Sequence, residues 1–283
     1  MIQKIFIPTL GRVDNQKTYD GLPDKWKEKA SLVVQMQEVD QYDKSKYNLI
    51  VLPEELGGEN GRCARSMGFI IDTLRYEFKY AIFDDDVSFV YTNKPESKVK
   101  PSNRPLEDDE YDYLFESLIP SWMDEGYVHI GLESTINISR DRDYQDNFRI
   151  SQAVFYDGSN LKVDKIDWWR TEFSADFDCN LQLLRAGFKN RVSCRYRIST
   201  SPTQAAGGCS LNRTVERHNR VMRQLKENHK EFVSLYEKEN LMEKGDSIKK
   251  LGAKIAWKKA YKSSQVGNIS DFLVSNENNL DKS

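Results

Sequence analysis

Short apolar segments alternate with polar connections along the first half of the chain. Residues 4–7, 31–36, 48–52 and 79–83 each form a short apolar run, and these runs predict four strands. Between residues 62 and 78, apolar side chains recur at helical spacing: Ala64, Met67, Ile71, Leu74 and Phe78. Strands separated by helices or long connections indicate a mainly parallel sheet with right-handed crossovers, which is an α/β fold.

The second half of the chain has a mixed pattern. Residues 127–132 and 151–156 predict strands, and residues 107–122 and 176–186 predict helices. Gly187 follows the second helix at the position where glycine commonly ends one.

A long helix is expected over residues 214–236. One face of it would carry Val215, His218, Met222, Leu225, His229, Phe232 and Tyr236. We therefore expect a catalytic core over residues 1–213, with a helical C-terminal extension over residues 214–283 packed on it. The tail from about residue 268 is polar and expected to fray.

Composition places the chain among ordinary globular proteins. It has 283 residues, of which 39% are hydrophobic and 30% charged, and no apolar run is long enough to cross a bilayer. Met1 leads directly into an apolar strand, so no signal peptide is expected. The four cysteines show no metal-finger spacing, which favours free thiols. These features predict a soluble cytoplasmic protein with no membrane partner.

Three adjacent carboxylates, Asp84, Asp85 and Asp86, follow the strand predicted at residues 79–83. Open α/β sheets bind ligands beyond the carboxyl ends of their strands. A Mg²⁺ or Mn²⁺ ion would relieve the mutual repulsion and would bind phosphate oxygens as well. Such an ion stabilises a departing nucleotide diphosphate. A solvated acidic turn is the alternative, and the preceding apolar strand favours the metal site.

Acidic residues also open the helix predicted at residues 176–186. Asp176 and Asp178 are candidates for a general base that takes a proton from an acceptor hydroxyl. The alternative is that both serve the helix dipole and cap. Arg12 and Arg65 are candidates for contact with phosphates or with the acidic triplet, although either would also suit the surface.

His218 and His229 lie eleven residues apart and share one helix face. Because that face is otherwise apolar, buried and hydrogen-bonded histidines are the simpler interpretation. His218 remains a candidate third metal ligand beside Asp84 and Asp86.

Four segments together resemble the glycosyltransferases of the GT-A fold. Residues 5–12 resemble their first strand and nucleotide-binding loop, and residues 61–65 resemble their G-x-x-x-R helix. Residues 83–87 resemble the DxD metal motif, and residues 175–188 resemble the segment that carries the base of inverting enzymes. The resemblance implies a UDP-sugar donor and a Mn²⁺ or Mg²⁺ ion held by Asp84 and Asp86. It also implies a donor site formed by Pro8, Thr9, Gly11, Arg12, Arg65, Asp84 and Asp85.

More narrowly, residues 2–235 are similar to the TET-associated glycosyltransferases of bacteriophages. The likeness lies in the Pro-Thr-Leu-Gly-Arg-Val-Asp-Asn-Gln start, the aspartate triplet, the Leu-Gln-Leu-Leu helix and the glycine-rich segment near residue 208. It implies sugar transfer onto a hydroxymethylated pyrimidine in phage DNA, within the host cytoplasm. The implied acceptor residues are Gly207, Gly208, Ser210 and Arg213, and Arg217, one of the basic residues nearby, is a further candidate. Ala175 stands where the class usually has Glu, so Asp176 becomes the first candidate base and Asp178 the second.

Charge along the chain is compatible with a DNA acceptor. Residues 185–226 contain ten basic residues and one acid, and a second lysine-rich run covers residues 249–262. Phosphate contacts from such patches give salt-sensitive affinity, and a base within a duplex would have to be flipped out. Solvated helix faces are the alternative, and a glycan, lipid or small-molecule acceptor is the main rival for the enzyme.

Two other classes of protein fit the sequence less well. A metal-dependent phosphohydrolase or nuclease would need further ligands, and the chain has three histidines. A DNA-binding module without activity would leave the acidic triplet unexplained. Glucose, galactose and arabinose donors remain alternatives.

Overall fold

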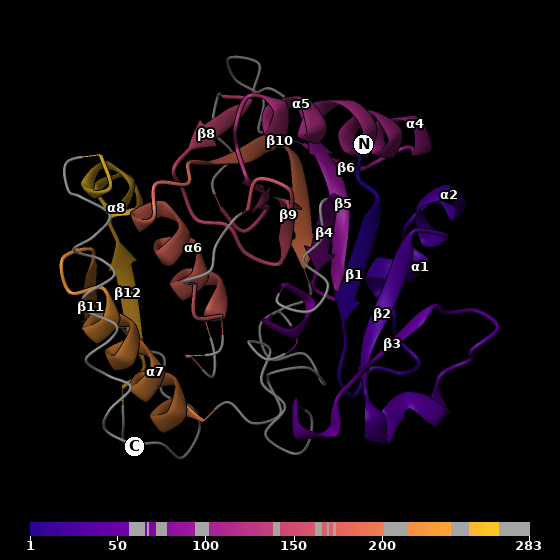
Figure 1. Ribbon diagram of the computed structural model, residues 1–283, viewed down its shortest axis with the longest axis horizontal. Helices are drawn as coiled ribbons and strands as arrows, with labels where there is room; N and C mark the ends of the chain where they lie inside the picture. The colour runs from indigo at the N-terminus through magenta and orange to yellow at the C-terminus, as the bar shows by residue number, and fades with distance from the viewer. Residues whose placement is uncertain are drawn as a thin grey trace.

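The computed structural model describes residues 1–56, 66, 68–71, 78–93, 102–137, 142–161, 166–168, 170–171, 174–200, 214–238 and 249–265. Within them, ten strands form one mixed sheet in the order β3-β2-β1-β4-β9-β7-β10-β5-β6, with β8 beside β10 (Figure 1). Its strands are β1 (Lys4–Pro8), β2 (Ala30–Gln35), β3 (Leu49–Leu52), β4 (Lys79–Phe83), β5 (Val87–Thr92), β6 (Asn103–Pro105), β7 (His129–Ser134), β8 (Tyr144–Asp146), β9 (Ala153–Asp157) and β10 (Asn190–Thr200).

The first four strands of this order form a parallel unit. β1 pairs in parallel with β2 and β4, and β2 pairs in parallel with β3. On the other side of β4 the pairing is mainly antiparallel, with β7 and β10 as a further parallel pair. The carboxyl ends of β1, β2 and β4 therefore meet at one edge, where the candidate donor residues follow β1 and β4. The predicted α/β fold is confirmed.

Helices cover both faces of the sheet (Figure 1). On one face α4 (Asp108–Asp112), the π-helical turn η3 (Tyr113–Leu118) and α5 (Ile119–Asp124) pack on side chains such as Phe83 and Phe155. On the other face α6 (Ala175–Arg185) packs on residues such as Ile82 and Tyr156. Successive strand residues point to opposite faces, which is why both faces are apolar. Pro120 lacks an N–H for the helical ladder, which accounts for the wider turn before it.

Short helices lie between and after the first three strands. They are α1 (Lys17–Asp20), α2 (Asp24–Lys27), η1 (Met36–Gln41) and η2 (Glu54–Leu56). Ser66 and residues 68–71 are helical, and the rest of the helix predicted at 62–78 lies outside the described residues apart from Phe78. No described helix is long and apolar enough to span a membrane.

The C-terminal extension differs from the long helix that the sequence predicts. Helix α7 (Val215–Asn228) ends eight residues early and is followed by the antiparallel pair β11 (Val233–Glu237) and β12 (Leu251–Ile255) and by α8 (Trp257–Ser263). One face of this strand pair is apolar. Together with α7 and α8, that face packs against Leu181 and Leu184 of α6. We call residues 214–238 and 249–265 the C-terminal module.

A glycine explains the close pairing of the two strands in the C-terminal module. Gly252 lies opposite Tyr236, and a Cβ on Gly252 would come within 2.5 Å of the tyrosine ring. The absent side chain therefore lets the ring lie across the strand.

Candidate active site

The aspartate triplet lies in the turn between β4 and β5, and backbone contacts fix this turn. The Asp84 amide donates to the Gln152 carbonyl at 2.7 Å. The Thr18 hydroxyl donates to the Asp84 carbonyl at 2.6 Å and accepts from the Val87 amide at 2.9 Å. Helix α1 and the start of β9 thus hold the triplet in place from two sides.

The three aspartates have different surroundings. Asp85 is 6% exposed and accepts hydrogen bonds from the Thr9 hydroxyl, at 2.7 Å, and from Arg12. The same guanidinium lies 3.2 Å from an Asp86 carboxylate oxygen, whereas Asp84 is exposed and has no ion pair with a described residue. The protein therefore holds the middle carboxylate, whereas the outer two keep accessible surface.

Electrostatics leave the triplet short of positive charge. Although Asp84 keeps exposed surface, neighbouring protein displaces part of the water around its carboxyl, and the charges of Asp85, Asp86 and Asp176 repel it, so the pKa of Asp84 is raised well above its usual range. Burial also raises the pKa of Asp85, although Thr9 and Arg12 oppose the shift. An added divalent cation would stabilise both ionised forms.

The donor set fits Mg²⁺ or Mn²⁺ in chemistry, because these ions prefer carboxylate and phosphate oxygens. Within the described residues, no three His, Cys, Asp or Glu side chains already converge as a ligand group. Phosphate or water oxygens would have to complete the coordination of an ion bound at Asp84 and Asp86.

The loop after β1 is tied to the triplet through residues that the sequence analysis missed. Gln16 donates to the Thr9 hydroxyl at 3.1 Å and to the Arg12 carbonyl at 2.7 Å. Gly11 has a φ of 66°, which favours glycine, and its amide donates to Glu38 at 2.8 Å. Gln16 and Glu38 could have been expected near the triplet only from the arrangement of β1, β2 and β4, whose carboxyl ends meet at one edge of the sheet. Arg12 itself contacts the acidic triplet, one of its two predicted alternatives.

Asp176 lies in the first turn of α6, and its charge is close enough to act on Asp84. Its side chain is 27% exposed and lies 3.7 Å from Arg149. Asp176 and Gln152 line the same pocket between β9 and α6. Gln152 and Ser174 have positive φ angles of 61° and 57°, a strained backbone that often occurs at functional sites. Asp176 thus remains accessible beside the triplet.

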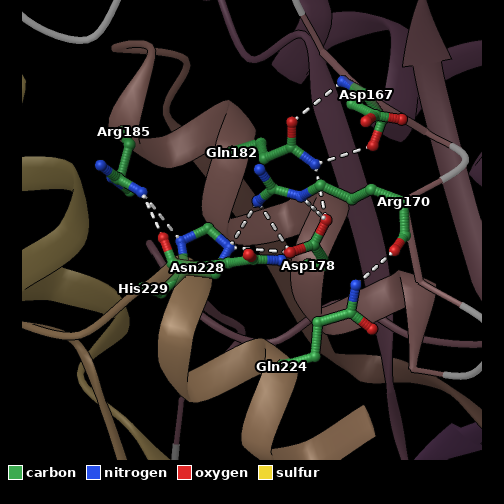
Figure 2. Close-up of polar contacts among 8 residues, drawn as sticks. All are labelled: Asp167, Arg170, Asp178, Gln182, Arg185, Gln224, Asn228 and His229. Atoms are coloured by element: carbon green, nitrogen blue, oxygen red, sulfur yellow. Dashed lines mark hydrogen bonds and ion pairs between the residues drawn. The ribbon is translucent and has the colours of Figure 1, made fainter. Parts of the chain in front are cut away.

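Asp178 has the opposite environment, as Figure 2 shows. It is 1% exposed and accepts four hydrogen bonds. Arg170 donates through Nε at 2.7 Å and Nη2 at 2.8 Å, Gln182 donates at 2.6 Å, and His229 Nε2 lies at 2.9 Å. These donors saturate both carboxylate oxygens.

The contacts continue outward from Asp178. Gln224 donates to the Arg170 carbonyl at 2.8 Å, and Arg185 donates to the Asn228 carbonyl at 3.1 Å. Arg185 also lies 3.1 Å from His229 Nδ1, and because a guanidinium only donates, Nδ1 accepts and Nε2 carries the proton that Asp178 accepts. Arg170 Nη2, 3.0 Å from the same Nε2, then lies beside it without a hydrogen bond to it. We call Arg170, Asp178, Gln182, Arg185 and His229 the Asp178 cluster.

Two sequence predictions need correction. Asp178 was the second candidate base, but a buried carboxylate with four donors has no free lone pair directed at an acceptor hydroxyl. His218 was a candidate metal ligand, but its Nε2 lies 2.9 Å from the Leu251 carbonyl, where α7 packs on β12. The structure therefore does not bring His218 together with Asp84 and Asp86.

The predicted basic patch over residues 185–226 is also partly wrong. Arg191, Arg195 and Arg197 of β10 are at most 7% exposed. Arg191 binds Asp146 at 2.8 Å, Arg195 binds Asp143 at 3.0 Å, and Arg197 donates to backbone carbonyls at 2.7 and 2.8 Å. These arginines stabilise the fold. Arg217 lies half-buried at the start of α7. Arg65, Gly207, Gly208, Ser210 and Arg213 lie outside the described residues.

The chain is similar in sequence to two phage glucosyltransferases. The chain is 24% identical over 263 residues to the β-glucosyl-HMC-α-glucosyl-transferase of Enterobacteria phage T2, covering 89% of this chain and 91% of that protein. The protein of the same name from phage T6 is 24% identical over 233 residues, covering 80% of each.

Solved structures of S. aureus TarS residues 1–349 also match. One has a TM-score of 0.45 and 14% identity, and the other, in complex with UDP, has a TM-score of 0.42 and 16% identity. Each match covers 81% of this chain, which spans 65% of the TarS chain. The profile of the TET-associated glycosyltransferases matches residues 3–208. The chain belongs to the TET-associated glycosyltransferase family and is a glycosyltransferase with an α/β fold.

Proposed function

We propose that this glycosyltransferase transfers a sugar from a nucleotide-sugar, with UDP as the nucleotide, onto 5-hydroxymethylcytosine in phage DNA. The names of both phage relatives contain HMC and glucosyl transfer, and one TarS structure contains UDP. The observation that carries the chemistry is Asp84, a carboxylate with exposed surface that lies beside three other acids and forms no ion pair with a described residue. Action on phage DNA would take place in the host cytoplasm.

On the donor side, Asp84 and Asp86 would hold Mn²⁺ or Mg²⁺. The bound ion supplies electrostatic stabilisation of the diphosphate leaving group. Asp85, Thr9 and Arg12 orient the triplet through the contacts described above. Pro8, Gly11 and Arg65 complete the proposed donor site.

On the acceptor side, Asp176 would act as the general base. The acceptor hydroxyl oxygen forms a bond to the anomeric carbon as the bond to the nucleotide diphosphate breaks. Asp176 takes the hydroxyl proton in the same step, and the anomeric configuration inverts. Its partial exposure and its closeness to Asp84 support this role.

The C-terminal module supports a DNA acceptor. It carries twelve Lys and Arg residues against four Glu residues, a net charge of +8. Arg223, Lys254, Lys258 and Lys262 are exposed and have no ion pair with a described residue. Exposed cationic side chains that are not held in ion pairs are what non-specific phosphate contacts require. Gly207, Gly208, Ser210, Arg213 and Arg217 remain proposed acceptor residues.

The decisive experiment is mass analysis of nucleosides after incubation of the enzyme with DNA and a panel of nucleotide-sugars. The DNA would carry cytosine, 5-hydroxymethylcytosine or its glucosylated form, because the relatives' names contain both HMC and β-glucosyl-HMC. We expect a mass increase of one sugar on a hydroxymethylated nucleoside only. Sugar transfer to a soluble glycan, with every DNA unchanged, would refute the DNA acceptor and leave the sugar-transfer chemistry.

A further inference from the structure

The Asp178 cluster joins the start of α6 to the C-terminal module (Figure 2). Asp178 stands two positions after Asp176, in the same helical turn. Its donors come from α6 itself, from Arg170 in the preceding segment and from His229 just after α7. Residues within one α-helical turn keep a fixed geometry relative to one another. A displacement of Asp178 therefore moves Asp176.

The start of α6 lacks the usual means of fixing a helix end. Ser174, the N-cap residue, has φ 57° and ψ 30° and makes no side-chain capping hydrogen bond within the described structure. A capping serine normally accepts from the backbone of the first turn. At α6 the side-chain contacts of Asp178 hold that turn from the side.

Resting on the role proposed for Asp176, we propose that Asp178 is a positioning residue for the transfer reaction and that Arg170 and His229 act through it. The fork of Arg170 fixes both carboxylate oxygens, at 2.7 and 2.8 Å, and His229 adds a contact at 2.9 Å. Gln224 and Arg185 link this group to α7. The C-terminal module thereby becomes part of the support of the active site.

The test is a double-mutant cycle. Asp178→Asn keeps the shape of the side chain but presents an amide to the Arg170 fork. We expect kcat to fall about 10²-fold, as for other small misplacements of reacting groups, with KM for the nucleotide-sugar within about twofold of wild type. In an Asp176→Asn background the same change should cost almost nothing more, because Asp178 acts through Asp176.

Two further variants separate positioning from loss of stability. Met222→Ala removes a buried side chain from the core of the C-terminal module but none of the hydrogen bonds described for the Asp178 cluster. It should lower the melting temperature but leave kcat near wild type. His229→Gln keeps a donor near the Nε2 position and should retain most of kcat, whereas His229→Asn is too short to reach Asp178 and should lose it.

The outcomes distinguish this proposal from the proposed function. If Asp178→Asn lowers kcat no more than Met222→Ala at equal loss of melting temperature, while Asp176→Asn is impaired, the positioning role fails and the proposed function stands. Full additivity of the Asp176 and Asp178 effects would also overturn it. If Asp176→Asn itself retains wild-type turnover, the proposed base fails and the positioning role fails with it.

Discussion

Two carboxylate sites lie near each other in this enzyme and have opposite environments. At the end of β4, Asp84 faces like charges, and Arg12 satisfies mainly Asp85. In α6, Asp178 has four donors and no exposure that a substrate could use. The difference teaches that the number of donors around a carboxylate, rather than its place in an acidic motif, separates a ligand site from a structural tie.

The largest effect is expected at the triplet. Asp84→Asn should reduce transfer below about a thousandth of wild type, because the leaving diphosphate would lose the metal-assisted stabilisation proposed above. The melting temperature should stay the same or rise, since one repelling charge is removed. Transfer rates with and without excess chelator, followed by added Mn²⁺ or Mg²⁺, provide the measurement. Asp24→Asn, at a fully exposed carboxylate, is the matched control. Undiminished transfer in chelator would remove the metal hypothesis.

The next effect is expected at Asp176. Asp176→Asn should lower kcat by about 10²–10⁴-fold, the range for loss of a general base, with donor affinity nearly unchanged. Steady-state kinetics with isothermal titration of UDP provides the measurement. Product stereochemistry offers an independent check, because retention of the anomeric configuration would contradict a direct displacement assisted by this base.

Much of the sheet could be predicted from apolar runs, whereas the C-terminal module could not. The strand at residues 79–83 was predicted to the residue because it is buried and ends at the polar triplet. The strand β11 was missed because Phe232 and Tyr236 continue the helical spacing of α7, while the period-two pattern spans five residues. Where a short segment fits both the helical spacing and the period-two pattern, packing decides whether it forms a helix or a strand. Here pairing with β12 makes it a strand.

The candidate site shows the same limit. The triplet and the acidic start of α6 could be proposed as site residues because the acids within each group lie close together in sequence. The pairing of Asp178 with His229 joins residues 51 positions apart, and no local pattern indicates it. The arginines of β10 resembled a basic surface because charge is usually exposed, whereas here Asp143, Asp146 and backbone carbonyls compensate it.

A smaller effect concerns pH and the Asp178 cluster. Burial and the nearby Arg170 and Arg185 lower the pKa of His229, although Asp178 opposes the shift. Below the ordinary histidine pKa of about 6.5, His229 therefore binds a proton in the unfolded state but not in the folded state. Stability should fall as pH decreases from about 6.5, by at most about 1.4 kcal/mol per pH unit from this group.

Asp178 adds a second loss at lower pH. Burial alone would raise its pKa, but hydrogen bonds from His229 and Arg170 outweigh burial and lower it. Its contribution is present above an unfolded value of about 3.9 and is lost as pH falls through the lower folded value. Urea denaturation from pH 7 to pH 3 measures both effects. His229→Gln should flatten the slope between pH 6.5 and 5, and an unchanged slope would contradict the assignment to His229.

The smallest effect is expected on the surface of the C-terminal module, where arginines and lysines are exposed, in contrast to the arginines of β10. Arg223→Ala and Lys258→Ala should each flatten the logarithmic salt dependence of DNA binding, by about one unit for each phosphate that the protein no longer neutralises. Lys44→Ala, at an exposed lysine of the first half, is the control and should leave the slope unchanged. Fluorescence anisotropy at several salt concentrations measures binding, and nucleotide release without acceptor should persist in all three variants. If the control and the C-terminal variants gave equal slopes, DNA would contact another surface, and the proposed acceptor residues between 207 and 217 would be the next to test.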